Sequence, residues 1–489
     1  MPEVVVNGWT SRLRRIGSSG GVRTGALGLG VSVALTENLW AHAGHRGYVL
    51  LLPTQMYITG GGIVVALTFA LVLFGIRQRR SVSGESLALE PSPIPDSLVG
   101  NYLGLAGLVL LLASGFWGSR DPMLNPLPMT LWIVWWIGFT VATAVLGNFW
   151  RYLSPWPALL DLLKLLPGFQ DRLEAPAQQT VRFLPALVLF FGFAWVELIH
   201  PAPLDPEVLV ELILIYTLLV VAGAGWWGER QWLQTGEPFS VFFRMVGWLS
   251  PFSWNRSPSV SGTRLPLRLQ WPCGGLLKAP PLPPSGVAFV LLVLSTVSFD
   301  GLSRTFWWLA LVGENPLEFP GRTSMMLPNT LGLLGTFLVF SGAYWGTQRL
   351  AMWLNPEAPE AHRGVILSMI PIAFGYHFAH YLPALLVDVQ YAFKTYSDPF
   401  GMGWDLWGTA GWTVSAAYLT DHESVVLIWF FQVYSIVLAH VGAVIVAHLF
   451  QVQEVTSLSR KFWGQVPPTV LMIGYTVFGL WLLSTPVAT

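Results

Sequence analysis

The sequence predicts an all-α polytopic integral membrane protein, a helix bundle with about ten transmembrane helices behind a cleavable N-terminal signal. Three observations predict this fold class. Of the 489 residues, 53% are hydrophobic and only 11% are charged, whereas soluble domains carry about 25% charged residues. The 25 Trp and 29 Phe exceed what one aqueous core can hide. Apolar runs of about 20 residues, the length that crosses a bilayer as a helix, recur along the chain.

Composition also excludes several function classes. The formal net charge is zero, so it gives no argument for a nucleic-acid partner. The single cysteine, Cys273, excludes disulfide frameworks and cysteine-rich metal sites. We find no phosphate loop, no GxSxG nucleophile elbow and no HExxH zinc motif in the sequence. The lipid bilayer is therefore the first partner that the sequence predicts.

Residues 1–43 are typical of a signal peptide. Several arginines form a basic region, ALGLGVSVAL (26–35) is a short apolar core, and AHA (41–43) fits a small-x-small cleavage site. An uncleaved first membrane helix is the alternative. We expect the mature chain, 44–489, to form a single transmembrane domain.

The same segment contains a candidate copper site. Cleavage after Ala43 would remove His42, whereas cleavage after Ala41 would make His42 the new N-terminus. A free α-amine and its own imidazole form a bidentate nitrogen clamp suited to copper, and His45 would add a third nitrogen.

Ten apolar runs follow the signal, and each is near the length of a membrane span. Gly or Pro interrupts several of them, which membrane helices tolerate when neighbouring groups satisfy the freed backbone. The runs lie near residues 57–76, 98–117, 129–149, 183–199, 208–227, 285–302, 326–345, 365–386, 425–447 and 468–485.

The basic residues predict the orientation of these runs. The loops after the odd-numbered runs hold 17 Lys and Arg, and the loops on the other side hold 5. The positive-inside rule places the first set in the cytoplasm, so both mature termini are expected outside. The cytoplasmic loops then include 151–182 and 228–284, and the stretch SPFSWNRSPSVSGTRLPLRL (250–269) of the second is typical of an irregular basic surface. The outer loop covers 387–424.

Ionisable residues gather toward the outer leaflet. His377 and His380 share one face of the eighth run, and Glu197 and His200 have the same spacing at the outer end of the fourth. A charge at mid-bilayer costs about 2.5–3.5 kcal/mol on insertion scales, so such residues are functional candidates. Hydrogen bonds between helices are the alternative role for the two histidines of the eighth run.

The sixth run adds Asp300 near its outer end, with Arg304 four residues later. An ion pair that ties the helix end to a loop is the simplest role for these two residues. Counted from the outer start of the ninth run, His440 is about 22 Å deep. His448 lies at the cytoplasmic end of that run, so we exclude both histidines from the outer site.

These residues predict a site with mixed nitrogen and oxygen ligands for a divalent transition metal such as copper or zinc. A bound metal would activate water for hydrolysis or support redox chemistry. The candidate catalytic carboxylates are Glu197 and Asp300, and the candidate metal ligands are His377, His380, His200, His42 and His45.

Four segments resemble a bacterial polytopic membrane family whose members are commonly labelled fenitrothion hydrolase. They are AHAGHRGYVLLLP (41–53), STVSFDGLSRT (295–305), GYHFAHYLPALL (375–386) and SDPFGMGWDLWGTAGWT (397–413). The resemblance runs from about residue 41 to the last span. It implies metal-dependent hydrolysis of organophosphate-type esters by an enzyme of the bacterial inner membrane.

Two other function classes fit the same residues. The first is a non-catalytic membrane subunit or copper-handling protein, with other membrane or periplasmic subunits as partners. The second is a transporter. Transporters favour internal repeats with broken helices at the midplane, whereas here the polar residues lie toward one side and no repeat is evident.

Overall fold

A computed structural model describes residues 54–75, 98–174, 182–254, 267–315, 321–356, 364–452 and 458–485. All of these residues belong to one unit, Pro53–Thr489. The predicted signal segment 1–43, with His42, and also His45 lie outside the described residues.

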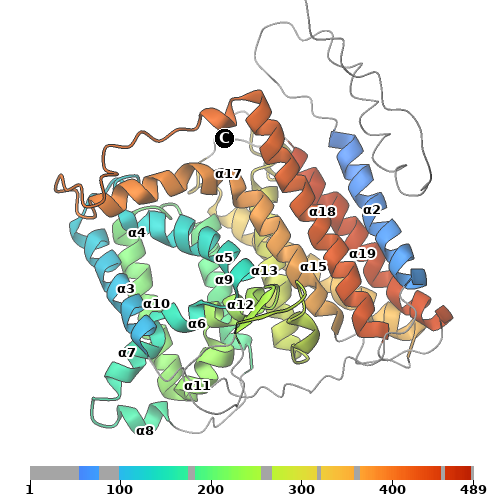
Figure 1. Ribbon diagram of the computed structural model, residues 1–489, viewed down its shortest axis with the longest axis horizontal. Helices are drawn as coiled ribbons and strands as arrows, with labels where there is room; N and C mark the ends of the chain where they lie inside the picture. The colour runs from blue at the N-terminus through green and yellow to red at the C-terminus, as the bar shows by residue number, and fades with distance from the viewer. Residues whose placement is uncertain are drawn as a thin grey trace, which may run out of the picture. The chain divides into compact units, whose positions relative to one another are not determined.

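Long apolar helices make up most of the described chain, which confirms the all-α membrane fold. Nine helical stretches among the described residues are long and apolar enough to cross a membrane. They are α2 (Thr54–Gly75), α3 (Val99–Trp117), the continuous α4 (Pro126–Pro128), η1 (Met129–Phe139) and α5 (Thr140–Leu146), α10 (Pro206–Trp227), α13 (Pro284–Ser303), α15 (Met326–Leu354), η4 (Val365–Ser368) with α17 (Met369–Ser397), α18 (His422–Val452) and α19 (Leu458–Ser484) (Figure 1).

The fourth predicted run forms a shorter helix than expected. Helix α9 (Leu184–Leu198) has 15 residues, which corresponds to a length of about 22 Å. The hydrocarbon core of a bilayer is about 30 Å thick. The described residues therefore give nine long helices and this short one. The predicted location of both termini on one side depends on α9 crossing the membrane and stays a prediction.

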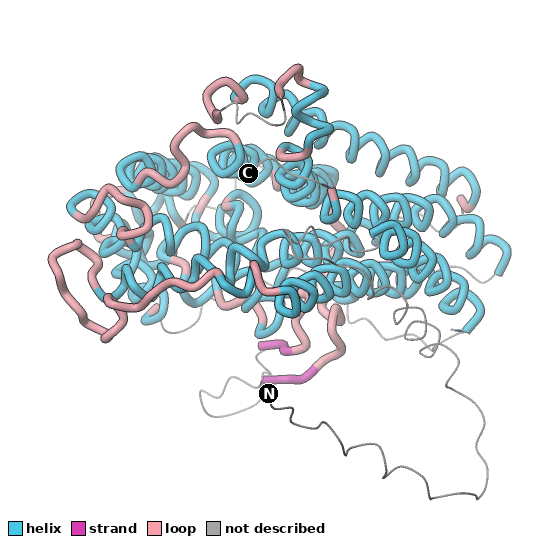
Figure 2. The backbone as a smooth tube through the Cα atoms, turned by 90° about the horizontal axis from the view of Figure 1, so that it is seen from above, coloured by secondary structure: helices cyan, strands magenta, loops and turns pink. Residues whose placement is uncertain are grey.

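Short elements connect the long helices, and the predicted cytoplasmic loop 228–284 contains several of them. Its helix α12 (Pro238–Gly247) is largely buried, with Phe239 and Phe243 in the main hydrophobic core, so this part of the loop is not a loose surface. The only strands in the described residues form a small antiparallel hairpin, which Figure 2 shows beside the helices. The short elements are α6 (Trp150–Leu153), α7 (Pro155–Leu163), α8 (Phe169–Leu173), α11 (Glu229–Gln231), η2 (Trp232–Gly236), β1 (Phe252–Trp254), β2 (Leu267–Leu269), η3 (Leu276–Lys278), α14 (Phe306–Leu311) and η5 (Ala417–Leu419).

Helix α17 is central because it packs against α18, η1 and α13. Figure 1 shows it changing direction along its length, and Pro383 lies inside the helix. A proline has no N–H, so the carbonyl of Ala379 one turn earlier loses its normal donor. The side-chain amide of Gln432 on α18 donates to that carbonyl at 2.7 Å. The bend is thus satisfied by a neighbouring helix, as membrane interiors require.

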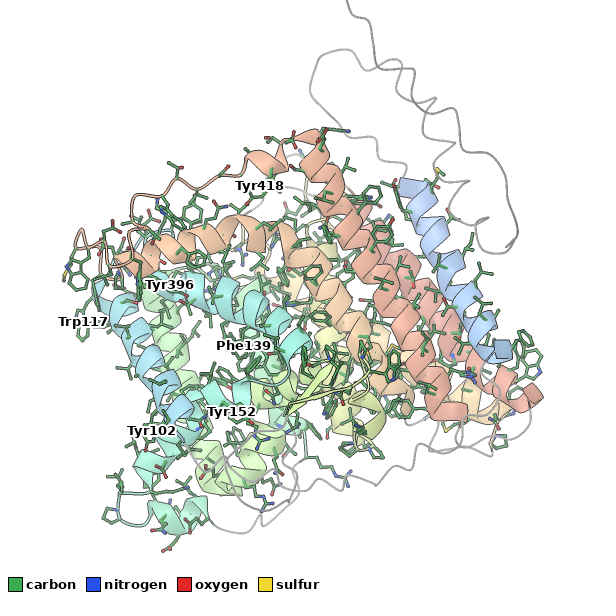
Figure 3. All side chains as sticks on the ribbon, viewed as in Figure 1. Tyr102, Trp117, Phe139, Tyr152, Tyr396 and Tyr418 are labelled. Carbon is green, nitrogen blue, oxygen red and sulfur yellow. The ribbon has the colours of Figure 1, made fainter. Side chains whose placement is uncertain are left out.

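Small residues allow these helices to approach closely. A Cβ atom at Gly375 of α17 would lie 2.4 Å from the Ala439 side chain of α18. After its bend, α17 also meets η1, where the hydroxyls of Tyr396, labelled in Figure 3, and Thr130 lie 2.9 Å apart. Helix α18 begins at His422 and ends at Val452, and these two residues give their names to the two ends of the bundle, the His422 end and the Val452 end.

Candidate proton-exchange site

Helices α9, α13 and α17 bring four ionisable side chains together near the His422 end. Glu197 is in the last turn of α9, Asp300 is in the last turn of α13, and His380 and Tyr381 lie side by side in α17. The Nε2 atom of His380 lies 2.8 Å from Oδ2 of Asp300. Of the residues that the sequence assigned to the outer site, the structure thus brings Glu197, Asp300 and His380 together from three different helices.

Tyr381 joins the two carboxyl groups. Its hydroxyl lies 2.8 Å from Oε1 of Glu197 and 2.8 Å from Oδ2 of Asp300. Asp300 is only 2% exposed, so these contacts take the place of water. The resulting chain runs from Glu197 through Tyr381 and Asp300 to His380.

Two arginines anchor this chain from the loops that follow α13 and α14. The guanidinium of Arg304 lies 3.4 Å from Oδ1 of Asp300, as the expected ion pair. The Asp300 carboxylate is the main reason that the pKa of Arg304 is raised. Arg322 donates to the backbone carbonyls of Glu197 and His200, at 3.1 and 3.2 Å. These carbonyls at the C-terminal end of α9 have no intrahelical partner, so Arg322 fixes the position of Glu197.

His377 occupies a drier part of the same region. Its ring lies edge-on to Trp136 of η1 and to Tyr381, with centroid distances of 5.0 and 4.8 Å. It forms a hydrogen bond with the backbone of Trp136. Its Nε2 atom is buried without a hydrogen-bonding partner in the described residues, and so is Oε2 of Glu197. The indole of Trp136 also lies close to Glu197.

A small cavity lies beside His377 and Tyr381. Its volume is about 30 Å³, and residues of η1, α9, α12, α13 and α17 line it, most of them apolar. A cavity needs about 10–15 Å³ on this measure to hold one water molecule. The site thus has room for water beside His377 and Tyr381.

The geometry differs in detail from the predicted site. Both histidines of α17 were expected to face Glu197, but Tyr381 makes the direct contact and His380 pairs with Asp300. The ring of His200 accepts a hydrogen bond from the backbone N–H of Ala202, and only its carbonyl joins the network through Arg322.

Sequence reasoning missed Tyr381 and Trp136, because neither carries a charge or an imidazole. It missed the role of Arg322, because only the folded chain brings this loop residue to the end of α9. The one available signal for Tyr381 was its position beside His380 in the HFAHY segment.

The described residues contain no group of three or more His, Cys, Asp and Glu side chains arranged to hold a metal ion. Two buried ligand atoms of the site, His377 Nε2 and Glu197 Oε2, have no hydrogen-bonding partner in the described residues. Two such atoms are not a complete ligand set. Metal binding by the predicted histidines stays a prediction.

Comparisons with family models, with curated proteins and with solved structures give no match for this chain. The resemblance to the fenitrothion hydrolase family is therefore untested. What the fold and the site define is a class, namely a multi-pass helical membrane protein with a buried chain of carboxyl, phenol and imidazole groups.

Proposed function

We propose that this protein is a proton-exchanging membrane protein, in which the chain from Glu197 to His380 binds and releases one proton. The observation that carries the proposal is the Tyr381 hydroxyl, 2.8 Å from an oxygen of each of two carboxyl groups. A hydroxyl has one hydrogen to donate. If both carboxyl groups were ionised, one of the two contacts would join oxygens with no hydrogen between them. One carboxyl group must therefore hold a proton.

The surroundings of the two carboxyl groups indicate which one holds it. Asp300 has charged or polar partners on both oxygens, Arg304 on Oδ1 and His380 on Oδ2, and these favour the ionised form. Glu197 has the Tyr381 hydroxyl on Oε1 and no partner on Oε2. Burial without such partners favours the neutral acid. The proton is thus on Oε1 of Glu197, which donates to Tyr381, and Tyr381 donates to Asp300.

This arrangement is a relay. When Glu197 passes its proton to the Tyr381 oxygen, Tyr381 passes its own hydrogen to Oδ2 of Asp300. One O–H bond breaks and one forms at each step, and Tyr381 ends neutral as it began. Asp300 then lies beside Arg304, whose side chain is 56% exposed. The proton can leave to water at that point, and the reverse sequence reloads the site.

Infrared spectroscopy of the purified protein tests the proposal. We expect the carbonyl-stretching band of a protonated carboxylic acid at neutral pH, and we expect Glu197→Gln to remove it. The matched control is Glu237→Gln, which changes a second buried glutamate and should leave that band in place. A wild-type spectrum without the band, or a band unaffected by Glu197→Gln, would contradict the proposal.

The predicted hydrolase is the second candidate, because His377, which lines the cavity, has an unpartnered Nε2 atom that can bind a ligand. It requires stoichiometric metal in the purified protein and turnover of an aryl phosphotriester. Protein that contains metal but shows no turnover would favour the copper-handling alternative. Proton exchange without metal would favour the transport class.

A further inference from the structure

A second row of buried polar side chains begins at the site and continues toward the Val452 end. Tyr376 of α17 stacks on His380, with ring centroids 6.3 Å apart and planes inclined by 11°. The ring centroids of Tyr475 on α19 and Tyr376 are 6.3 Å apart. Those of His440 on α18 and Tyr475 are 5.8 Å apart. Tyr376, Tyr475 and His440 all lie within the membrane-spanning helices. The row therefore leads inward from the proton-exchange site.

His440 has a defined protonation pattern in this row. It is 1% exposed, and its Nδ1 atom lies 2.8 Å from the backbone carbonyl of Ile436. A carbonyl oxygen only accepts hydrogen bonds, so Nδ1 carries the hydrogen. The Nε2 atom then has a free lone pair, and it has no hydrogen-bonding partner in the described residues. Such a nitrogen is a proton acceptor held near the middle of a membrane helix.

Tyr475 is the aromatic neighbour of this acceptor, with ring centroids 5.8 Å apart. Its oxygen lies 2.6 Å from the Ser298 hydroxyl of α13. Each of these hydroxyls can donate one hydrogen bond and accept another. The Ser298 hydroxyl donates to the backbone carbonyl of Leu294 at 2.7 Å. Tyr475 is therefore the donor of the pair, and its hydroxyl must turn from Ser298 to serve His440.

The row continues beyond His440 with amide side chains and a second histidine. His448 is about 12 Å further along α18, and its Nδ1 atom lies 3.0 Å from Oε1 of Gln465 on α19. The Nε2 atom of Gln465 and both amide atoms of Gln348 on α15 are buried without partners in the described residues.

Along the bundle axis, Gln348 lies at a depth between His440 and His448. Asn355 of α15 is next to Gly464, since a Cβ atom at Gly464 would lie 3.1 Å from the Asn355 side chain. Gln348 is about 10 Å nearer the His422 end than Asn355. A buried polar atom without a partner costs folding free energy. Several such atoms occur here at successive depths among α15, α18 and α19.

We propose that this row is a proton path from the site to the Val452 end, with His440 as its relay at the middle of the membrane. The proposal rests on the proposed function, because it needs the site to exchange protons. A proton from the Tyr475 hydroxyl binds Nε2 of His440. Tyr475 regains a hydrogen from the Tyr376 hydroxyl, and Tyr376 regains one from protonated Asp300 of the site. The imidazolium then releases the proton from Nε2 to water held by Gln348, and His448 passes it on. The net change is one proton moved and no bond altered.

The test uses the purified full chain in liposomes that contain a pH-sensitive dye. A potassium diffusion potential, negative inside, draws protons inward. We expect wild-type protein to acidify the interior faster than protein-free liposomes. Loss of a positioned proton carrier typically lowers a rate by about 100-fold or more. We therefore expect His440→Gln to slow acidification of the liposome interior by that factor. A glutamine can still donate to Ile436 O, but it cannot take a proton at neutral pH.

Tyr475→Phe is the second variant, with Tyr396→Phe as its matched control. Each removes one tyrosine hydroxyl that is bonded to a Ser or Thr hydroxyl on another helix. Only the Tyr475 hydroxyl lies in the row, so only Tyr475→Phe should slow acidification. If His440→Gln fails to fold, Tyr475→Phe decides the question, since it removes a single oxygen atom.

The outcomes separate this inference from the proposed function. If the carboxylic-acid band is present but wild-type liposomes acidify no faster than empty ones, the path is wrong and the site stands. If His440→Gln or folded Tyr475→Phe conducts at the wild-type rate, the path is also wrong. If the wild-type protein lacks the band, the proposed function itself fails.

Discussion

Two buried glutamates in this protein have opposite surroundings. Both oxygens of Glu237, at the start of α12, accept hydrogen bonds: Oε1 from the Tyr216 hydroxyl and the Phe239 N–H, and Oε2 from the Ser240 N–H at 2.6 Å. Glu197 has one hydroxyl partner on Oε1 and none on Oε2. A tyrosine is therefore the side-chain partner of each glutamate. The two sites differ in the backbone donors.

This difference teaches what burial alone does not show. Glu237 caps a helix N-terminus, where free N–H groups stabilise the ionised carboxylate. Glu197 is near the C-terminal end of α9, where carbonyls rather than N–H groups are free. We therefore interpret Glu237 as a fixed structural charge and Glu197 as a carrier of an exchangeable proton.

The largest expected effect comes from replacing each of the two glutamates by alanine in turn. Glu237→Ala leaves two backbone N–H groups and a tyrosine hydroxyl without an acceptor. We expect it to lower the free energy of unfolding by about 3 kcal/mol. Glu197→Ala leaves one hydroxyl that retains Asp300 as an acceptor, so its cost should be about 1 kcal/mol. Thermal unfolding in detergent measures both. Equal losses would remove the distinction between the two glutamates.

Arg322→Leu tests how firmly Glu197 is held. This change removes the two hydrogen bonds to the carbonyls of Glu197 and His200 at the end of α9. The guanidinium that makes them is partly buried, and burial lowers the pKa of Arg322. We expect a loss of about 1–2 kcal/mol in unfolding free energy. Because the end of α9 would move, the carboxylic-acid band of Glu197 should also broaden. An unchanged band would mean that Tyr381 alone positions the carboxyl group.

The sequence predicts much of the fold but only part of the site. Hydropathy found the long helices, because each must satisfy its backbone inside lipid. It overestimated α9, since composition does not report where a helix begins and ends. Spacing identified Asp300 with Arg304, a local pair on one helix. Tyr381 joins residues from three helices, and only tertiary packing brings them together.

Two further differences have the same physical origin. The sequence indicated no helix in the loop 228–284, yet α12 within it is buried and has Glu237 as its N-cap. Glutamate is not a common N-cap residue, so no pattern signalled this cap. His440 was excluded from the site by its depth, and its contacts with Tyr475 and Ile436 become visible only in the folded chain.

A matched pair of tyrosine variants tests the difference between the two glutamates with a smaller change in stability. Tyr216→Phe and Tyr381→Phe each remove one hydroxyl that is hydrogen-bonded to a buried glutamate. We expect each to cost about 1 kcal/mol in unfolding free energy. Only Tyr381→Phe should slow proton release from the site, because only that hydroxyl also reaches a second carboxyl group. A pH-indicator dye measures the release after a step in external pH. Slowing by both variants, or by neither, would contradict the assigned roles.

The smallest expected effect is the pH dependence that Glu237 gives to stability. Burial raises the pKa of Glu237, and its hydrogen bonds from Ser240, Tyr216 and Phe239 oppose the rise. A carboxyl group with a higher pKa in the folded state binds more protons there than in the unfolded state, over the range between the two values. The free energy of unfolding must then decrease as pH rises through that range. We expect this decrease just above the ordinary glutamate pKa, and we expect Glu237→Gln to reduce it, since glutamine does not titrate. Thermal unfolding of both proteins at a series of mildly acidic pH values measures the two slopes. If the slopes are equal, Glu237 does not titrate in this range, and its hydrogen bonds fully offset the cost of its burial.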